Sequence, residues 1–290
     1  MIRCRMLMVL IVALCFGETS GALAQTTKPP VIAGQVKVAY EQPSKKYEQL
    51  YEALKSRQVL ERLQRFLSPL RLPRDLTVRL AECGADTVAY APSGPVTICY
   101  EMVDKVVTIT MQNTTDANEQ ILVIDGTFVQ AVLHETAHAI FDLLQVPVWG
   151  REDDAADRLA ALIMLQFGDQ VALTTIVGTV KFFEYSKRAW TGADFADAGS
   201  PEAQRFYNFL CIAYGGDRIT FAFLAPPTGP RPGNRLPTLT EHRASRCAGE
   251  FEQVRHAFDL RIMPYVDPDL VIKVRASQWL KADEIPRDLQ

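Results

Sequence analysis

The chain has 290 residues, a formal net charge of −3, 48% hydrophobic residues and 22% charged residues. These fractions are ordinary for a globular protein and exclude a disordered or fibrous chain. The slight acidity comes without any basic cluster, so it gives no support to nucleic-acid binding or to a role at a membrane surface. The length is sufficient for one large domain with a buried core.

The first 24 residues have the pattern of a signal peptide. Arg3 and Arg5 form a basic start, residues 6–16 are an apolar run, and Ala22 to Ala24 make a small-x-small cleavage site. The apolar run is too short to span a bilayer comfortably, although a retained signal anchor is the alternative interpretation. We therefore predict a periplasmic or secreted mature chain that begins at Gln25 and has no membrane anchor after cleavage.

Cysteine usage agrees with export. Two of the six cysteines leave with the signal peptide, and the four that remain are an even set suited to an oxidising compartment. We favour the pairs Cys83 with Cys99 and Cys211 with Cys247, because each pair would join neighbouring elements. Four buried thiols are the alternative.

The N-terminal part of the mature chain predicts a small β-rich region. Residues 35–41 alternate between apolar and polar, which indicates a strand. Ser44 is a suitable N-cap for one helix that runs to about Leu67. Short apolar runs at residues 76–82, 87–90 and 96–99 are separated by turn sequences, so hairpins are expected. The pattern at residues 100–111 fits either a helix or a strand, and the polar residues 113–119 predict a loop.

The C-terminal half predicts a series of helices. An apolar stripe begins near Gly126 and includes Phe141, and it would pack on the sheet while two histidines on its flank line a cleft. Pro147 and Gly150 then break the chain. Further helices are predicted at residues 151–167, 169–189, 201–214 and 239–262. The sequence therefore predicts an α+β fold with one domain over residues 25–266 and a loosely packed tail at 267–290.

Residues 132–157, VLHETAHAIFDLLQVPVWGREDDAAD, carry the chemistry of the chain. In an α-helix residues i and i+4 lie on one face, so His134 and His138 can direct their imidazoles at one point, while Glu135 projects about 100° around the axis. This HExxH spacing is typical of a Zn²⁺ site with an adjacent general base. Glu135 would take a proton from the attacking water and pass it to the leaving amine. The alternative is an amphipathic helix that contains the pentapeptide by chance.

The third metal ligand is expected in the acidic cluster after the helix break. The next helix would return antiparallel, so that its first turn approaches the metal. We predict Asp153 as the ligand, with Glu152 as a rival, and Asp157 as the acceptor for the second ring N–H of a metal-bound histidine. Alternatively, these carboxylates only complement the dipole of the helix start. His242 and His256 lie at no ligand spacing and are interpreted as surface or packing residues.

Together with ICYE around Cys99 and QRFYNFLCIAYG around Cys211, this stretch resembles the DUF4344 family of bacterial metallopeptidases. The resemblance runs from about Leu76 to the helix that contains Cys247. It implies a zincin-like fold, in which a small N-terminal β-sheet packs on the HExxH active-site helix and a largely helical C-terminal half follows. The family usually has glutamate at the position of Asp153. It also often has a histidine before QRFYN, where this chain reads DFADAGSPEA.

Three functions are compatible with these residues. The first is a zinc metallopeptidase that hydrolyses a peptide or protein substrate with Glu135 as the base. The second is a catalytically inactive, zincin-fold interaction module of the cell envelope, which the departure at Asp153 and the missing histidine would allow. The third is a zinc amidase that acts on a non-protein amide through the same site.

Overall fold

A small mixed sheet and a set of helices make up the part of the chain that the computed structural model describes, namely residues 34–85, 88–189, 191, 199–226 and 238–276. All of these residues fall within the unit Ile32–Gln290. The fold is α+β, as the sequence predicts. The predicted signal peptide and its cleavage site lie outside the described residues.

The four strands found in the described residues form one sheet in the order β1-β2-β4-β3. Their bounds are β1 (Val36–Tyr40), β2 (Leu76–Ala81), β3 (Val88–Tyr90) and β4 (Val96–Cys99). β2 runs parallel to both β1 and β4, and only β3 with β4 forms an antiparallel pair. The expected hairpin between residues 76–82 and 87–90 is therefore wrong. The strongly buried β2 takes a central place, whereas the short and partly exposed β3 takes the edge.

The single helix expected from Ser44 to Leu67 is wrong, because two helices occupy this segment. They are α1 (Glu48–Ser56) and α2 (Val59–Leu67). Between them Gln58 has a left-handed backbone, with φ of 54°. The apolar residues Leu54 and Leu60 are six apart, which would place them on different faces of an unbroken helix. In the structure Leu60 is fully buried and Leu54 packs partly buried against the core.

Two further boundaries differ from the sequence prediction. Ser44 is no helix cap, because its backbone N–H and its hydroxyl both donate to the carboxylate of Glu82. The helix that carries HExxH begins at Ala117 rather than near residue 126. Its N-cap is Asp116, whose carboxylate accepts the backbone N–H groups of residues 118 and 119. The loop predicted at 113–119 is therefore confined to residues 114–116, between two helices. The segment that the sequence left open is also a helix, α3 (Tyr100–Asn113).

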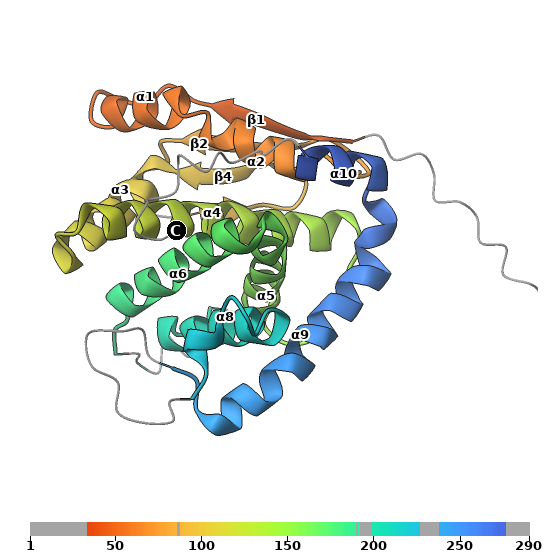
Figure 1. Ribbon diagram of the computed structural model, residues 1–290. Helices are drawn as coiled ribbons and strands as arrows, with labels where there is room; N and C mark the ends of the chain where they lie inside the picture. The colour runs from red at the N-terminus through yellow and green to blue at the C-terminus, as the bar shows by residue number, and fades with distance from the viewer. Residues whose placement is uncertain (1–33, 86–87, 190, 192–198, 227–237, 277–290) are drawn as a thin grey trace, which may run out of the picture. The chain divides into compact units, whose positions relative to one another are not determined.

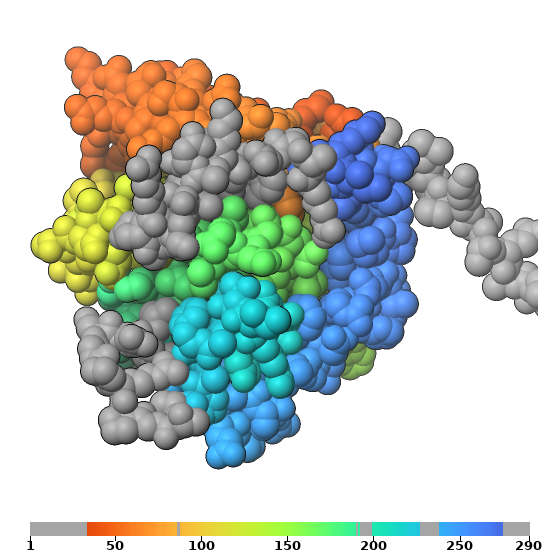
Figure 2. Space-filling view, viewed as in Figure 1, coloured from red at the N-terminus to blue at the C-terminus, as the bar shows by residue number. Residues whose placement is uncertain are grey.

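Helix α4 (Ala117–Leu143) lies along one face of the sheet (Figure 1). On the far side of α4 lie α5 (Glu152–Met164), α6 (Asp169–Ser186) and then α8 (Glu202–Gly216). α9 (Glu241–Arg261) packs on α8 and is largely exposed, as the space-filling view shows along one side of the described residues (Figure 2). α10 (Pro268–Ala276) follows, so regular structure continues beyond the predicted domain end at residue 266.

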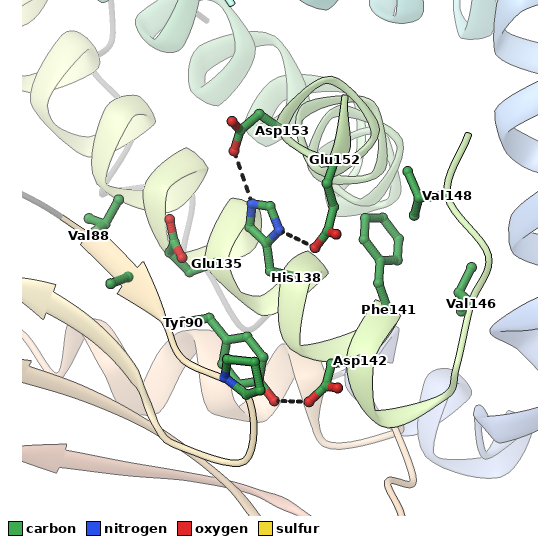
Figure 3. A pocket seen from close by; sticks show the side chains of 12 residues that line it. Val88, Tyr90, Glu135, His138, Phe141, Asp142, Val146, Val148, Glu152 and Asp153 are labelled. Carbon is green, nitrogen blue, oxygen red and sulfur yellow. Dashed lines mark hydrogen bonds and ion pairs between the residues drawn. The ribbon is translucent and has the colours of Figure 1, made fainter. Parts of the chain in front are cut away.

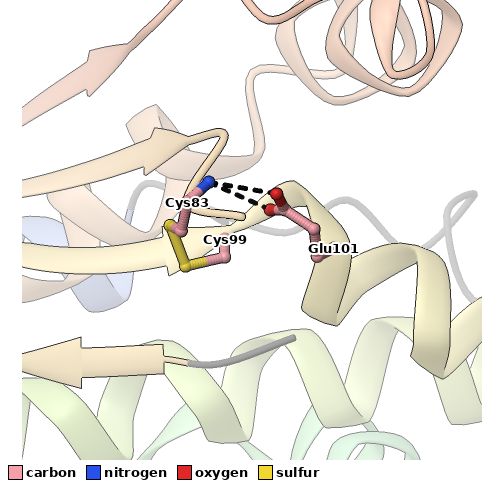
Figure 4. Close-up of side chains that lie close together, drawn as sticks. All are labelled: Cys83, Cys99 and Glu101. Carbon is pink, nitrogen blue, oxygen red and sulfur yellow. Dashed lines mark hydrogen bonds between the residues drawn. A yellow bond between two sulfur atoms is a disulfide. The ribbon is translucent and has the colours of Figure 1, made fainter. Parts of the chain in front are cut away.

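Two cysteine pairs tie neighbouring elements together, in the pairing that the sequence favours. Cys83 and Cys99 join the ends of β2 and β4, with an S–S distance of 2.00 Å (Figure 4). Beside them, Glu101 accepts the backbone N–H of Cys83. Cys211 and Cys247 join α8 to α9 in the buried core. Both pairs suit an oxidising compartment. Among the described residues, no helix is long and apolar enough to cross a membrane.

Candidate metal centre

The turn between α4 and α5 brings an acidic helix start back onto the HExxH segment. Gln145 and Gly150 both have positive φ, at 51° and 103°, and they frame this turn. The value at Gly150 lies in a region that side chains with a Cβ rarely adopt. After the turn, Glu152 and Asp153 open α5 against the C-terminal half of α4. The first turn of α5 therefore approaches the two histidines, as the sequence predicts.

Three ligand-type atoms converge between α4 and α5. Nε2 of His134 and Nε2 of His138 lie 3.2 Å apart, and Oδ1 of Asp153 lies 3.4 Å from the first and 3.2 Å from the second. Tetrahedral zinc with bonds of about 2.0–2.1 Å separates its ligand atoms by roughly 3.3 Å. The three atoms thus span one face of such a tetrahedron, and the group fits a metal ion of this size.

The other ring nitrogen of each histidine faces a carboxylate. Nδ1 of His134 lies 2.8 Å from Oδ1 of Asp157. Nδ1 of His138 lies 2.7 Å from Oε1 of Glu152, and Figure 3 shows this second contact. Ionised carboxylates only accept hydrogen bonds, so each Nδ1 carries the hydrogen and each Nε2 keeps a lone pair. Three acceptor atoms then face one another, which is an arrangement that a cation between them stabilises.

Protons and a metal ion compete for this site. Burial disfavours the charged form of His134, but Asp157 and Asp153 outweigh it and raise the pKa of His134 to about 9. The pKa of His138 is also raised despite burial, by Asp153 and Glu152. When a proton occupies Nε2 in place of a metal ion, the two histidines donate hydrogen bonds to Asp153 and hold its pKa well below its usual range. The acidic residues therefore give the site a strong attraction for positive charge.

Glu135 lies next to the three converging atoms without being one of them. Its side chain is buried and lines the cleft between α4 and the edge strand β3 (Figure 3). Burial raises the pKa of Glu135, and the two neighbouring histidines oppose this rise. A carboxyl group with a raised pKa is suited to accept a proton and then donate it near neutral pH.

The cleft beside the site has a volume of about 600 Å³. The edge strand β3 forms one wall, and within the described residues β3 pairs with β4 on one side only. Phe141, Val146 and Val148 form an apolar part of the opposite wall (Figure 3). Tyr90 donates its hydroxyl hydrogen to Asp142 across the cleft, at 2.6 Å. The space next to the converging atoms is thus part strand edge and part apolar pocket.

The structure brings the predicted site residues together on two helices. These are His134, Glu135, His138, Glu152, Asp153 and Asp157. Glu152 lies at the opposite side of the His138 ring from Asp153. His242 and His256 are exposed on α9, away from this group.

Sequence reasoning missed two residues that contact the site. Gln130 and Arg205 both donate hydrogen bonds to the buried carboxylate of Asp157. Gln130 stands four residues before His134, so helical spacing alone could have placed it on the same face. Arg205 belongs to the QRFYN segment, but no local pattern links it to α5. Phe141 was assigned to the apolar stripe, and in the structure it also lines the cleft.

Comparison with known proteins agrees with the residues that the sequence singles out. Residues 40–260 match the family model DUF4344, which is described as a putative metallopeptidase. The matched segment covers most of the chain and contains the whole group around His134. No curated protein and no solved structure matches the chain.

Proposed function

Because the chain belongs to the DUF4344 metallopeptidase family, we propose that it hydrolyses peptide bonds with a zinc ion held by His134, His138 and Asp153. The observation that carries this proposal is the triangle of acceptor atoms, whose edges of 3.2–3.4 Å suit a tetrahedral metal ion. Two imidazole nitrogens and one carboxylate oxygen are a common catalytic set for zinc. The placement of α4 beneath a small sheet supports a zincin-like fold.

Asp153 is favoured over Glu152 as the third ligand. Its oxygen approaches both Nε2 atoms, whereas the oxygen of Glu152 approaches Nδ1 of His138. Glu152 and Asp157 then act as hydrogen-bond acceptors that orient the two metal-binding rings. The loss of one methylene relative to glutamate does not prevent Asp153 from reaching the histidines.

Glu135 is the proposed general base. When bound, zinc lowers the pKa of a water to about 7 and polarises a carbonyl group. Glu135 lines the cleft beside this position, so it can take a proton from the attacking water. It then passes that proton to the nitrogen of the leaving amine, which completes the cleavage of the amide bond.

The cleft favours an extended peptide as the substrate. The edge strand β3 forms one wall of the cleft, and an extended chain would lie along this wall. The apolar side chains of Phe141, Val146 and Val148 would accept an aliphatic or aromatic side chain near the scissile bond. The two cysteine pairs and the predicted signal peptide support action in the periplasm or outside the cell.

A peptide-library cleavage assay, run with zinc analysis of the same samples, tests the proposal. Wild-type protein should cleave peptides and contain zinc. Glu135→Gln should keep the zinc and lose about 10²- to 10⁴-fold in rate, the range typical of a general base. Glu252→Gln, an exposed residue of α9, is the matched control and should leave the rate unchanged. Unchanged hydrolysis in Glu135→Gln, or wild-type protein without zinc, would refute the proposal.

A further inference from the structure

Arg205, on α8, contacts the buried acid beside the candidate metal centre. Its Nε donates to Oδ2 of Asp157 at 2.6 Å, and its Nη2 donates to Oδ1 at 2.8 Å. The central carbon of the guanidinium group also lies 4.6 Å from the centre of the Phe183 ring. The guanidinium group is therefore held along its edge by the carboxylate and on its flat face by the aromatic ring.

Asp157 needs this partner because its side chain is 1% exposed. A buried carboxylate is costly unless hydrogen bonds and a cation compensate for the lost water. Asp157 accepts hydrogen bonds from Arg205, from Nε2 of Gln130 at 2.9 Å and from Nδ1 of His134 at 2.8 Å. Of these three donors, Arg205 is the one with a permanent charge, and it supplies two of the four bonds.

The orientation of Asp157 determines the orientation of His134. The Nδ1–H of His134 points at Oδ1 of Asp157, which leaves Nε2 directed at Asp153 and His138. Asp153 and Asp157 are also four residues apart on α5 and share one face of that helix. The ion pair between α8 and α5 therefore holds the carboxylate of Asp157 on the face of α5 that Asp153 shares.

We infer that Arg205 is a positioning residue of the metal centre, which acts by holding Asp157 against His134 and Asp153 in place on α5. The inference rests on the proposed function, because it requires a metal ion at this site. The ring of His138 is held differently, since its partner Glu152 is 55% exposed in its side chain. Loss of Arg205 should therefore weaken metal binding more than loss of Glu152.

Zinc affinity of the purified, metal-free protein tests this inference, measured by competition with a chelator. Arg205→Gln should lower the affinity by about 10- to 100-fold, the range typical of partners that orient a ligand. Arg205→Lys keeps the charge but loses the two-point geometry, so a smaller but measurable loss of several-fold is expected. Equal affinity in wild type and Arg205→Gln would overturn the inference.

Arg243→Gln is the matched control. Arg243 is a partly buried arginine on α9 that forms an ion pair with Glu250 and donates to Asn208. Arg243→Gln should leave zinc affinity unchanged. If Arg243→Gln and Arg205→Gln lowered zinc affinity equally, the effect would be explained by disturbed packing in general, and the inference would be overturned. Thermal unfolding of the metal-free proteins identifies which variants are folded. If Arg205→Gln is not folded, Arg205→Lys decides, and wild-type affinity in that variant counts against the inference.

The absorption spectrum of the cobalt(II)-substituted protein adds a readout that a purely structural role would not change. Arg205→Gln should alter the spectrum, because the direction of His134 changes, whereas Arg243→Gln should not. Failure of the proposed metal site gives a different result, since the wild-type protein itself would then bind neither zinc nor cobalt. Failure of peptide hydrolysis alone leaves the zinc affinities of wild type and Arg205→Gln measurable. Zinc binding by wild type with an unaffected Arg205→Gln would overturn the inference alone.

Discussion

Two adjacent acids occupy different positions around one imidazole ring. Oδ1 of Asp153 lies 3.2 Å from Nε2 of His138, while Oε1 of Glu152 lies 2.7 Å from Nδ1 of the same ring. Successive residues of a helix project about 100° apart, which lets neighbours reach opposite sides of the ring. Glu152 is half exposed, whereas Asp153 also faces the buried ring of His134. Their expected contributions to metal binding therefore differ.

Asp153→Asn should weaken zinc binding by more than roughly 100-fold, beyond the range typical of outer partners, because it removes a charged ligand. Glu152→Gln should weaken it by about tenfold, since it changes only the hydrogen bond that orients His138. Competition titrations of the metal-free proteins compare the two variants directly. A larger loss in Glu152→Gln than in Asp153→Asn would identify Glu152 as the ligand.

The sequence predicts some of these residues far better than others. His134, Glu135 and His138 follow from helical spacing, because one regular helix fixes their relative directions. The choice between Asp153 and Glu152 depends on how α5 returns, and backbone angles in the connecting turn determine that return. Arg205 is 48 residues from Asp157, and its role depends on the packing of α8 against α5. No spacing rule reaches across that distance.

Among the helices, the crossing of α4 and α6 holds the metal-site helix in place. A Cβ built on Gly178 would lie 2.0 Å from the carbonyl oxygen of Leu122, and one on Gly126 would lie 2.5 Å from that of Thr175. The two backbones approach this closely because neither glycine has a side chain. Near the start of α4, Lys181 and Tyr185 of α6 also donate to the carboxylate of Glu119.

Gly178→Ala should destabilise the protein by about 1–3 kcal/mol or more, because backbone atoms must separate to admit the methyl group. Gly249→Ala is the control, since Gly249 is exposed on α9 with no neighbour within 4 Å of the added carbon. That variant should be neutral or more stable by up to about 1 kcal/mol, because alanine favours the helix. Denaturant unfolding measures both, and similar values for the two variants would contradict this account of the crossing.

The hydrogen bonds that Glu119 accepts predict that the stability of the protein depends on pH. Burial opposes the charge of Glu119, but hydrogen bonds from Lys181 and Tyr185 prevail and lower its pKa. A lowered pKa in the folded state gives stability that is present above the unfolded pKa of about 4.3 and is lost as pH falls through the folded value. The difference in free energy of unfolding between wild type and Glu119→Gln should therefore shrink as pH falls from 6 towards 3. If this difference in free energy of unfolding stays constant or grows as pH falls, the role given to Glu119 is wrong.

For helices and strands, the sequence predicts type better than boundaries or partners. The long apolar pattern identifies α4, but its start was placed nine residues late because the first turns are polar. The pairing of β2 with β4 instead of β3 depends on which strand is most buried, a property of the assembled sheet. The break at Gln58 is detectable in principle, from the shift in the spacing of the leucines around it.

In the molecule as a whole, the N-terminal sheet and the C-terminal helices meet at α4. The sheet supplies β3 as one wall of the cleft, and α4 and α5 supply the converging ligand atoms. The Cys83–Cys99 pair stabilises the sheet side, and the Cys211–Cys247 pair stabilises the packing of α8 on α9. Through Arg205, α8 in turn contacts the acid that orients His134. The site thus depends on both halves of the fold.

Zinc content per chain is the most direct test of the metal centre. Purified wild-type protein, incubated with zinc and dialysed, should retain one zinc ion per chain, because His134, His138 and Asp153 form one tetrahedral face. The double variant His134→Ala, His138→Ala should retain none while keeping its helical circular-dichroism signal. Wild-type protein without bound zinc, or a double variant with the same zinc content as wild type, would contradict the account.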